Sequence, residues 1–551
     1  MTKDIDPALN GLSSETLRDA LLQFNYFPRQ HDHKEELPPI FHTETLTSAV
    51  AGKLLAVKER SNGYDVLLYR RTRHPNIPRI MGIPHPRAYV QLVRDITDNW
   101  EEHIGSVCQS PNSQIEFGLH DDKRLVVLKY DHEAADGEVE DQDPFVDFGK
   151  KYRIKTDITN FFHSIYSHSL PWALVGHNKA KQNKFKNTKW YNQLDRSTRF
   201  CQRNETKGIP IGPSTSSILS EIILFKVDEV LRLEKGYQFA RYIDDYTAYV
   251  QDEVEADQFL LDLATELEKY TLTLNPKKTS TVPLPVATRD EWVTDINVFF
   301  GLEPDLIGQD EDSTQRKKIK FRQLKLIIDK AISLSKEFPD GSVLKYALSA
   351  IVETGIEDDQ EEAHRYFQDA CLRYAYYYPT LIPLIQRWLP STEPIQPNEH
   401  KIEKRIKSLL NRSFEQGQSD NIVWCIYFLL QTTGETVDDL LEKCCNSDDP
   451  MVVLMGFVYA RKKEINITPI QQWARNKISQ IKSNDLQEYD IDRFWLVLYQ
   501  LYFEGVIDTP PYSDANDNRI FEILKAEKVS FVNWEHEDFE RLSRWANKIF
   551  G

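Results

Sequence analysis

Three aspartates in two apolar segments have the residue type and the spacing to carry metal-dependent chemistry. Asp244 and Asp245 are adjacent within the run ARYIDDYTAYV at 240–250, and Asp157 ends the strand-like run YRIKTD at 152–157. Neighbouring residues of a regular strand point to opposite faces, so both carboxylates of the pair can reach one site only if the chain turns there. The pattern therefore predicts a hairpin with Asp244 and Asp245 near its tip.

Three carboxylates at close range oppose one another's ionisation unless positive charge neutralises them. Divalent cations would do so, and hard oxygen ligands suit Mg²⁺, which also takes ligands from substrate phosphates. Two such ions clamp the attacking and leaving oxygens of an in-line phosphoryl transfer. The aspartates thus favour a site with two Mg²⁺ ions, with Mn²⁺ as a substitute, although an isolated Asp-Asp pair is as readily a solvated turn.

Three further segments bear on the same chemistry. Residues 207–216 (KGIPIGPSTS) are a Gly/Pro-rich approach to a helix, and their amides and hydroxyls would suit a template strand or a nucleotide. Residues 271–279 (TLTLNPKKT) place a lysine pair after a strand-like run, and residues 298–302 (VFFGL) have the pattern of a short apolar strand. Taken singly, the three segments fit equally well a helix-capping loop, a solvated basic turn and a core strand.

The order of these motifs resembles the palm of reverse transcriptases over about residues 150–302. It runs from an Asp-bearing strand through a Gly-rich helix start and a Tyr-x-Asp-Asp hairpin to Leu-Asn-x-x-Lys-Thr and Phe-x-Gly-Leu. Within that superfamily, Asp-Ile-x-x-Phe-Phe followed by Gly-Ile-Pro-Ile-Gly-Pro-Ser-Thr-Ser is similar to the abortive-infection (Abi) reverse transcriptases of bacterial phage defence. The prophage-borne, AbiK and AbiA types are the most similar.

The resemblance implies roles for individual residues. The two metal ions would be held by Asp157, Asp244 and Asp245, with help from the backbone carbonyl of Ile158. Phe162 matches the position whose ring excludes a 2′-hydroxyl, so deoxynucleoside triphosphates would be the preferred substrates.

Further positions match the motifs that surround the metal site. Lys278 matches a lysine near the leaving pyrophosphate, where it would neutralise charge or donate a proton. Gly212 lies in the segment expected to hold the nucleotide, and Phe300 and Gly301 lie in the primer-grip strand, against nucleic acid. One residue departs from the pattern, because Ile211 stands where ordinary reverse transcriptases usually carry glutamine. An apolar side chain cannot supply the glutamine's hydrogen bonds around template and nucleotide.

Charge is distributed unevenly along the chain. The 551 residues include 68 Lys and Arg against 85 Asp and Glu, a formal net charge of −17, which argues against a uniformly basic surface for nucleic acid. Residues 150–220 are nevertheless strongly basic, and lysines alternate with aromatic residues there, as in proteins that bind single strands. The same composition fits a mobile basic loop. The candidate nucleic-acid contacts are Lys181, Lys184, Lys186 and Lys189.

Arginines in the region that resembles the fingers are candidates for the triphosphate, since the arginine fork matches phosphate oxygens. The candidates are Arg70, Arg71 and Arg79, together with Arg73 and Arg87.

The elements that must position these residues divide into two parts. Strand-like and helix-like segments alternate over about 150–310, which predicts an α+β fold. The resemblance implies a right-hand polymerase with fingers and a ferredoxin-like split βαβ palm. From about residue 313, apolar residues recur with a helical period. We predict a fingers-and-palm domain over 1–310 and an all-α domain over 311–551 in place of an ordinary thumb, with a HEAT-like repeat as one arrangement for it.

Within the fingers, two β-like runs between residues 53 and 69 are joined by Ser61-Asn62-Gly63, which predicts a hairpin. A helix is predicted from Ala88 to about Glu102.

Six scattered cysteines without a CxxC pair argue against a disulfide framework or a zinc ribbon. No signal peptide is recognisable, and no run approaches the ~20 apolar residues that cross a bilayer. We therefore expect a soluble protein of the bacterial cytoplasm with no membrane partner.

The leading hypothesis is an Abi-type polymerase that forms homo-oligomers. It would make single-stranded DNA without a template, primed by a protein tyrosine to which the product stays attached. Two alternatives are a conventional RNA-templated reverse transcriptase of the retron or intron kind, and an inactive polymerase fold that serves as a binding scaffold.

Overall fold

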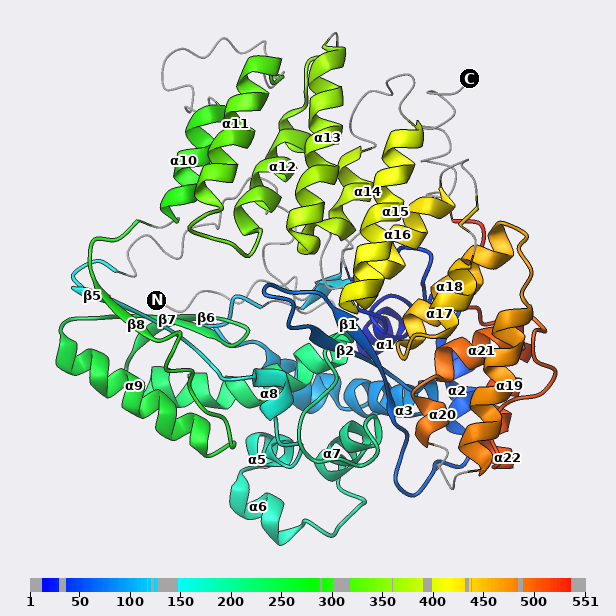
Figure 1. Ribbon diagram of the computed structural model, residues 1–551. Helices are drawn as coiled ribbons and strands as arrows, with labels where there is room; N and C mark the ends of the chain where they lie inside the picture. The colour runs from blue at the N-terminus through cyan, green and yellow to red at the C-terminus, as the bar shows by residue number, and fades with distance from the viewer. Residues whose placement is uncertain are drawn as a thin grey trace.

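The computed structural model combines a small antiparallel sheet with many helices, an α+β architecture (Figure 1). It describes residues 12–28, 36–115, 117–119, 123–126, 147–287, 290–300, 318–358, 360–389, 399–431, 436–437, 439–483 and 489–536.

The palm is a four-stranded sheet with the order β6-β7-β5-β8, in which every neighbouring pair is antiparallel. The strands are β5 (Tyr152–Asp157), β6 (Gln238–Tyr242), β7 (Asp245–Val250) and β8 (Ser280–Pro283). Alternate residues of β7, namely Tyr246, Ala248 and Val250, are buried, as expected for a strand with one face on a core. Helices α8 (Ser214–Glu229) and α9 (Glu253–Glu268) cover that face.

The fingers pair β1 (Val66–Arg71) with β2 (Arg79–Pro84) in an antiparallel ribbon. The hairpin predicted between residues 53 and 69 is therefore wrong. Residues 48–55 instead form α2 (Ser48–Leu55), which Thr47 caps and which buries Val50, Ala51 and Leu54 at helical spacing. After Asn62-Gly63 the chain runs toward the end of the helix Trp190–Phe200, because the backbone nitrogen of Tyr64 donates to the Phe200 carbonyl at 2.9 Å.

Helices and short strands surround this ribbon. They are α1 (Ser14–Gln23), α3 (Pro86–Thr97), a π-helix (Trp100–Ile104), a 3₁₀ helix (Gly105–Cys108), β3 (Gly118–Leu119) and β4 (Leu125–Val126). The predicted helix from Ala88 thus begins two residues earlier, at Pro86, where a proline suits the first turn.

Between β5 and α8 the chain forms four helices. They are α4 (Phe161–Ser164), α5 (Ser169–Val175), α6 (His177–Gln182) and α7 (Trp190–Phe200). The basic stretch around residues 179–189 therefore begins on α6 and continues through turns to the start of α7.

The carboxy-terminal half is helical. Its helices are α11 (Phe321–Leu334), α12 (Ser342–Thr354), α13 (Glu361–Tyr377), α14 (Ile385–Trp388), α15 (Glu399–Gln416), α16 (Ser419–Leu430), α17 (Leu440–Cys445), α18 (Pro450–Lys462), α19 (Thr468–Ser483), α20 (Tyr489–Asp492), α21 (Trp495–Phe503) and α22 (Ala515–Ala526). Their arrangement does not by itself establish a HEAT-like repeat. They return to the fingers, because α16 and α18 pack against β1 and α22 packs against α2. No helix among the described residues is long and apolar enough to span a membrane.

The predicted apolar strand at 298–302 is also wrong over its described part. Residues 298–300 end the helix α10 (Glu291–Phe300), and Gly301 and Leu302 lie outside the described residues. Ile296 and Phe300, four residues apart, are buried, whereas Val298 is 72% exposed. This spacing belongs to one face of a helix that packs on α11.

Candidate active site

The three aspartates lie at one end of the palm sheet. In the register of β5 and β7, Asp157 is opposite Asp245. Tyr242 pairs with Asp245 across β6 and β7, so Ile243 and Asp244 form a two-residue turn. Ile243 has φ = 54°, a left-handed conformation that is costly for a β-branched residue and that tight hairpin turns require. The predicted hairpin at these aspartates is therefore confirmed.

Arg241 holds this turn from inside the protein. Its guanidinium donates to the Ile243 carbonyl at 2.9 Å. It also forms ion pairs of 2.8 Å with Glu221 and Asp228 on α8, and all three side chains are buried. Burial alone would lower the pKa of Arg241, but these two carboxylates raise it well above its usual value. Arg241 was not among the predicted site residues, although a charged residue within an apolar strand indicates a buried ion pair.

The lysine segment is fastened to the end of β5. The backbone nitrogen of Asn275 donates to the Asp157 carbonyl at 2.8 Å, and the hydroxyls of Thr156 and Thr279 are 2.7 Å apart. These contacts bring the Lys278 ammonium into a hydrogen bond with the Asp157 carboxylate. That bond raises the pKa of Lys278, which therefore supplies positive charge beside the aspartates.

The carboxylates at the turn are held less acidic than usual. Burial, followed by the charge of Asp245, raises the pKa of Asp244 from its ordinary 3.8 to about 6. Burial also raises the pKa of Asp245, and the positive charges of Lys278 and Lys155 partly offset this rise. Lys155 lies two residues before Asp157, on the same face of β5. It was not among the predicted site residues.

The described residues contain no group of three or more His, Cys, Asp or Glu side chains arranged to hold a metal ion. The aspartates are neighbours at the sheet end rather than a preassembled ligand cluster. Their chemistry nevertheless fits divalent cations, because one carboxylate oxygen of Asp157 is buried without a hydrogen-bond partner. The raised pKa of Asp244 likewise reflects negative charge that a cation would neutralise. Ile158, the predicted carbonyl ligand, pairs with Leu274 in an isolated bridge directly after β5.

Arginines from the fingers lie within electrostatic reach of the aspartate turn. Burial, with Arg73 and Arg71 adding to it, lowers the pKa of Arg79 to about 10, while Asp244 opposes this shift. Burial, followed by the charge of Arg71, also lowers the pKa of Arg73, and the charge of Asp244 again opposes this shift. Arg71, Arg73 and Arg79 thus form a positive cluster, in which Arg71 is ion-paired with the buried Glu36 at 3.3 Å. His163, on α4, is a further neighbour, whose pKa burial and Arg79 lower.

The structure does not bring the other two arginine candidates to this cluster. Arg70 alternates with Arg71 along β1, so it points to the opposite face, and its charge acts on Asp449 of the helical half. Arg87 is buried in the fingers, where its guanidinium donates to the Val57 carbonyl at 3.1 Å.

Phe162 stands on α4, directly after the turn that follows Asp157. Its carbonyl accepts a hydrogen bond of 2.9 Å from the backbone nitrogen of Ile209, which joins α4 to the Gly-rich segment. Its half-buried ring lies 5.2 Å from that of Phe161. The position five residues after Asp157 is therefore fixed by packing and by the backbone.

The Gly-rich segment docks onto the fingers. The Gly82 nitrogen donates to the Ile211 carbonyl at 2.8 Å. Gly212 has φ = +134°, and a Cβ there would lie 2.7 Å from Pro28, so both conformation and space require glycine. The predicted availability of the hydroxyls is wrong for two of them. The Ser214 hydroxyl accepts from Asn25 at 2.9 Å and the Ser216 hydroxyl donates to the Pro210 carbonyl at 2.5 Å, and both serines are buried.

The predicted nucleic-acid contacts are spread over the molecule. Lys181, Lys184, Lys186 and Lys189 are exposed on α6 and the turns after it. In Figure 1 this part lies on the side of the palm opposite α11–α16. Phe300 is buried on α10, and Gly301 lies outside the described residues.

Comparison with known proteins points to one family. Residues 131–348 match the family model described as "Reverse transcriptase (RNA-dependent DNA polymerase)", and this segment contains all three aspartates and Lys278. No curated protein sequence matches the chain.

Among solved structures, the chain is similar to telomerase from Candida albicans in complex with a fragment of telomeric RNA, with 13% identity and a TM-score of 0.24. That match covers 60% of this chain and 66% of the telomerase chain, just under two thirds of its length. The chain is also similar to apo telomerase from Candida tropicalis, with 11% identity, coverage of 70% and 71%, and a TM-score of 0.28.

Proposed function

We propose that this chain, whose residues 131–348 match the reverse transcriptase family model, is a metal-dependent polymerase that makes DNA from deoxynucleoside triphosphates. The observation that carries the proposal is the meeting of Asp157, Asp244 and Asp245 at the end of the palm sheet, opposite the arginine cluster of the fingers. Carboxylates on one side and the positive charges of Arg73 and Arg79 on the other suit a cation-bound triphosphate.

Each side chain has a defined task in this proposal. Asp157, Asp244 and Asp245 hold divalent cations, which reverse transcriptases generally use and which neutralise charge on the reacting phosphate oxygens. Arg73 and Arg79 bind the triphosphate oxygens. Lys278 stabilises the negative charge that develops on the leaving pyrophosphate. The ring of Phe162 lies against the sugar and excludes a 2′-hydroxyl.

We further propose that synthesis is template-independent, starts on a tyrosine hydroxyl of a homo-oligomer and serves defence against phage. Support comes from Ile211, which is 7% exposed and whose carbonyl is bound to Gly82. The position that is usually glutamine therefore offers no polar side chain to a template. The description of the matched family favours the second candidate, a conventional RNA-templated reverse transcriptase. The contact between Lys278 and Asp157 favours the third, an inactive scaffold, because an ammonium already neutralises that carboxylate.

One assay separates the three functions. The purified chain is given Mg²⁺ and four deoxynucleoside triphosphates, with or without a defined RNA template and complementary primer. DNA made without RNA supports the proposal, products that copy the RNA support the conventional enzyme, and no DNA under either condition supports the scaffold. Asp244→Asn should abolish synthesis, whereas Asp257→Asn, an exposed aspartate of α9, should not.

Mass spectrometry of the protein purified from cells tests the priming step. The proposal predicts DNA covalently bound to one tyrosine, and this adduct should be absent from Asp244→Asn. An adduct that persists in the variant would show that another enzyme made it.

A further inference from the structure

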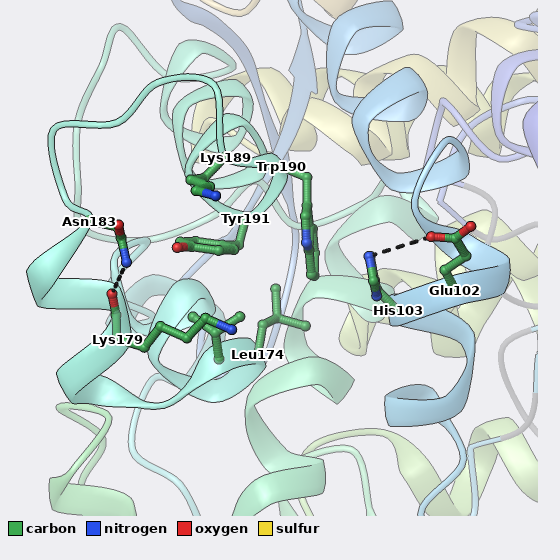
Figure 2. A pocket seen from close by; sticks show the side chains of 9 residues that line it. Glu102, His103, Leu174, Lys179, Asn183, Lys189, Trp190 and Tyr191 are labelled. Carbon is green, nitrogen blue, oxygen red and sulfur yellow. Dashed lines mark hydrogen bonds and ion pairs between the residues drawn. The ribbon is translucent and has the colours of Figure 1, made fainter.

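A cavity lies apart from the aspartates, between α5, α6, α7 and the π-helix that follows α3 (Figure 2). Its volume is about 400 Å³, which is large enough for a nucleotide-sized ligand. Its lining includes the basic and aromatic residues Lys179, Lys189, Trp190 and Tyr191. In Figure 1 the helices that form this cavity lie opposite α11–α16, and none of the lining residues belongs to the candidate active site.

One wall of the cavity is an aromatic surface. The indole of Trp190 stacks on the His103 ring, with centroids 4.5 Å apart and an interplanar angle of 9°. Figure 2 shows His103 against one face of the indole and the cavity, with Leu174 and Tyr191, on the other side. A flat ring that entered the cavity would therefore complete a stack whose other members are already in place.

The opposite wall contains a buried polar group without a hydrogen-bond partner. Tyr191 is only 3% exposed, yet its buried hydroxyl has no hydrogen-bond partner. Lys179 and Lys189 also line the cavity, and Lys189 is the cap residue of α7 without a side-chain hydrogen bond to the helix. An anion bound here would satisfy the hydroxyl, the lysines and the positive end of α7 together.

These features select the class of ligand. Two lysines disfavour a metal cation, and the carboxylate nearest to the cavity, Glu102, is 85% exposed and already lies 3.8 Å from His103. Charged walls also disfavour a purely apolar ligand. A phosphate joined to a flat ring satisfies both walls, and this combination is a nucleotide.

We propose that this cavity binds one nucleotide of a single-stranded nucleic acid and anchors the strand away from the aspartates. Its base stacks on Trp190, and its phosphate contacts Lys179, Lys189 and the Tyr191 hydroxyl. A strand is favoured over a free nucleotide because exposed basic and aromatic side chains continue from the cavity. They are Lys181, Lys184, Phe185, which is 85% exposed, and Lys186. The inference rests on the proposed function only in that a polymerase supplies such a strand.

Binding is tested without catalysis, in the full chain carrying Asp244→Asn and with no divalent cation present. Fluorescence anisotropy of a labelled twelve-residue oligothymidylate gives the dissociation constant. Trp190→Leu should weaken binding about tenfold, as expected for one lost base stack, and Trp190→Phe should restore most of it. Lys179→Ala should lower the slope of log Kd against log salt by about one. The matched control Lys336→Ala, an exposed lysine on the opposite side, should change neither quantity.

A crosslink keeps the proposal falsifiable if Trp190→Leu is misfolded. An oligonucleotide carrying 5-iododeoxyuridine should crosslink to Trp190 or Tyr191, as mapped by mass spectrometry. Crosslinks confined to other segments would overturn the proposal, as would equal dissociation constants for folded Trp190→Leu and its parent. If equimolar thymidine monophosphate displaced the oligonucleotide, the ligand would be a free nucleotide and the proposal of a bound strand would be overturned. Because the parent is catalytically disabled, these outcomes are independent of whether the chain proves to be a polymerase.

Discussion

Asp420, at the start of α16, accepts hydrogen bonds from both the backbone nitrogen and the hydroxyl of Thr72, at 2.9 and 2.5 Å. Thr72 directly follows β1 and precedes Arg73, so this carboxylate of the helical half holds one end of the arginine loop. The side chain of Gln418 donates to Asn76 within the same loop at 2.8 Å. The helical half therefore contacts the loop on both sides of Arg73.

Asp420→Ala should impair nucleotide binding more than turnover. The change leaves the Thr72 nitrogen and hydroxyl without their acceptor, which costs about 1–3 kcal/mol and loosens the loop. We expect KM for deoxynucleotides to rise several-fold with a smaller change in kcat, measured by incorporation of labelled nucleotide. Asp420→Asn is the matched control, since its amide oxygen can still accept from the Thr72 nitrogen. Equal KM values for the two variants would contradict a positioning role.

Arg241 should be among the most sensitive residues of the palm. Arg241→Met leaves Glu221 and Asp228 as buried, unpaired carboxylates, so unfolding should become easier by about 3–5 kcal/mol, as measured in urea. Lys318→Met removes a lysine whose ion pair with Asp358 is exposed on both sides, and it should have little effect. A comparable decrease in the free energy of unfolding in both variants would show that burial of this ion-pair network does not matter for stability.

The raised pKa of Asp244 predicts a pH-dependent effect on stability. Burial and Asp245 disfavour its ionised form, so above about pH 6 the folded protein carries a penalty, which vanishes below about pH 4, where the carboxyl is neutral in both states. Without divalent cations, Asp244→Asn should stabilise the protein by about 1–2 kcal/mol at pH 8 and not at pH 4. Thermal unfolding at both pH values measures this difference.

Divalent cations should stabilise the parent protein more than the Asp244→Asn variant. In the proposed function Mg²⁺ binds the ionised carboxylate of Asp244, so it should raise Tm of the parent protein at pH 8 more than at pH 5. Asp244→Asn should respond weakly at both values. An equal response of the two proteins at pH 8 would place the binding site for Mg²⁺ elsewhere.

Phe162→Ala should relax the choice between deoxynucleotides and ribonucleotides. In the proposed function the ring occupies the space of a 2′-hydroxyl, so its removal should reduce the discrimination, expressed as a ratio of kcat/KM values, by about tenfold or more. Phe162→Tyr keeps the ring and should keep the discrimination. An unchanged ratio in the alanine variant would show that another group contacts the sugar.

Local patterns predicted well those elements whose signals act over a few residues. The hairpin at Asp244 and the terminal position of Asp157 on β5 follow from apolar alternation and from chain reversal. The same reasoning failed at Asn62-Gly63, because contacts with Phe200 fix the path of that turn. It failed again at Phe300, since four-residue spacing over only part of a segment is hard to tell from a strand.

The sequence by itself determined the chemistry available to this protein: three aspartates, a lysine after Leu-Asn-x-x, an aromatic residue after Asp157 and arginines in the fingers. The tertiary structure decided which of these meet. It selected Arg71, Arg73 and Arg79 over Arg70 and Arg87, paired Arg241 with α8, and placed Asp420 against Thr72 across 348 residues of chain. Side-chain direction and long-range contacts depend on how whole elements pack, and no local pattern of residues encodes that packing.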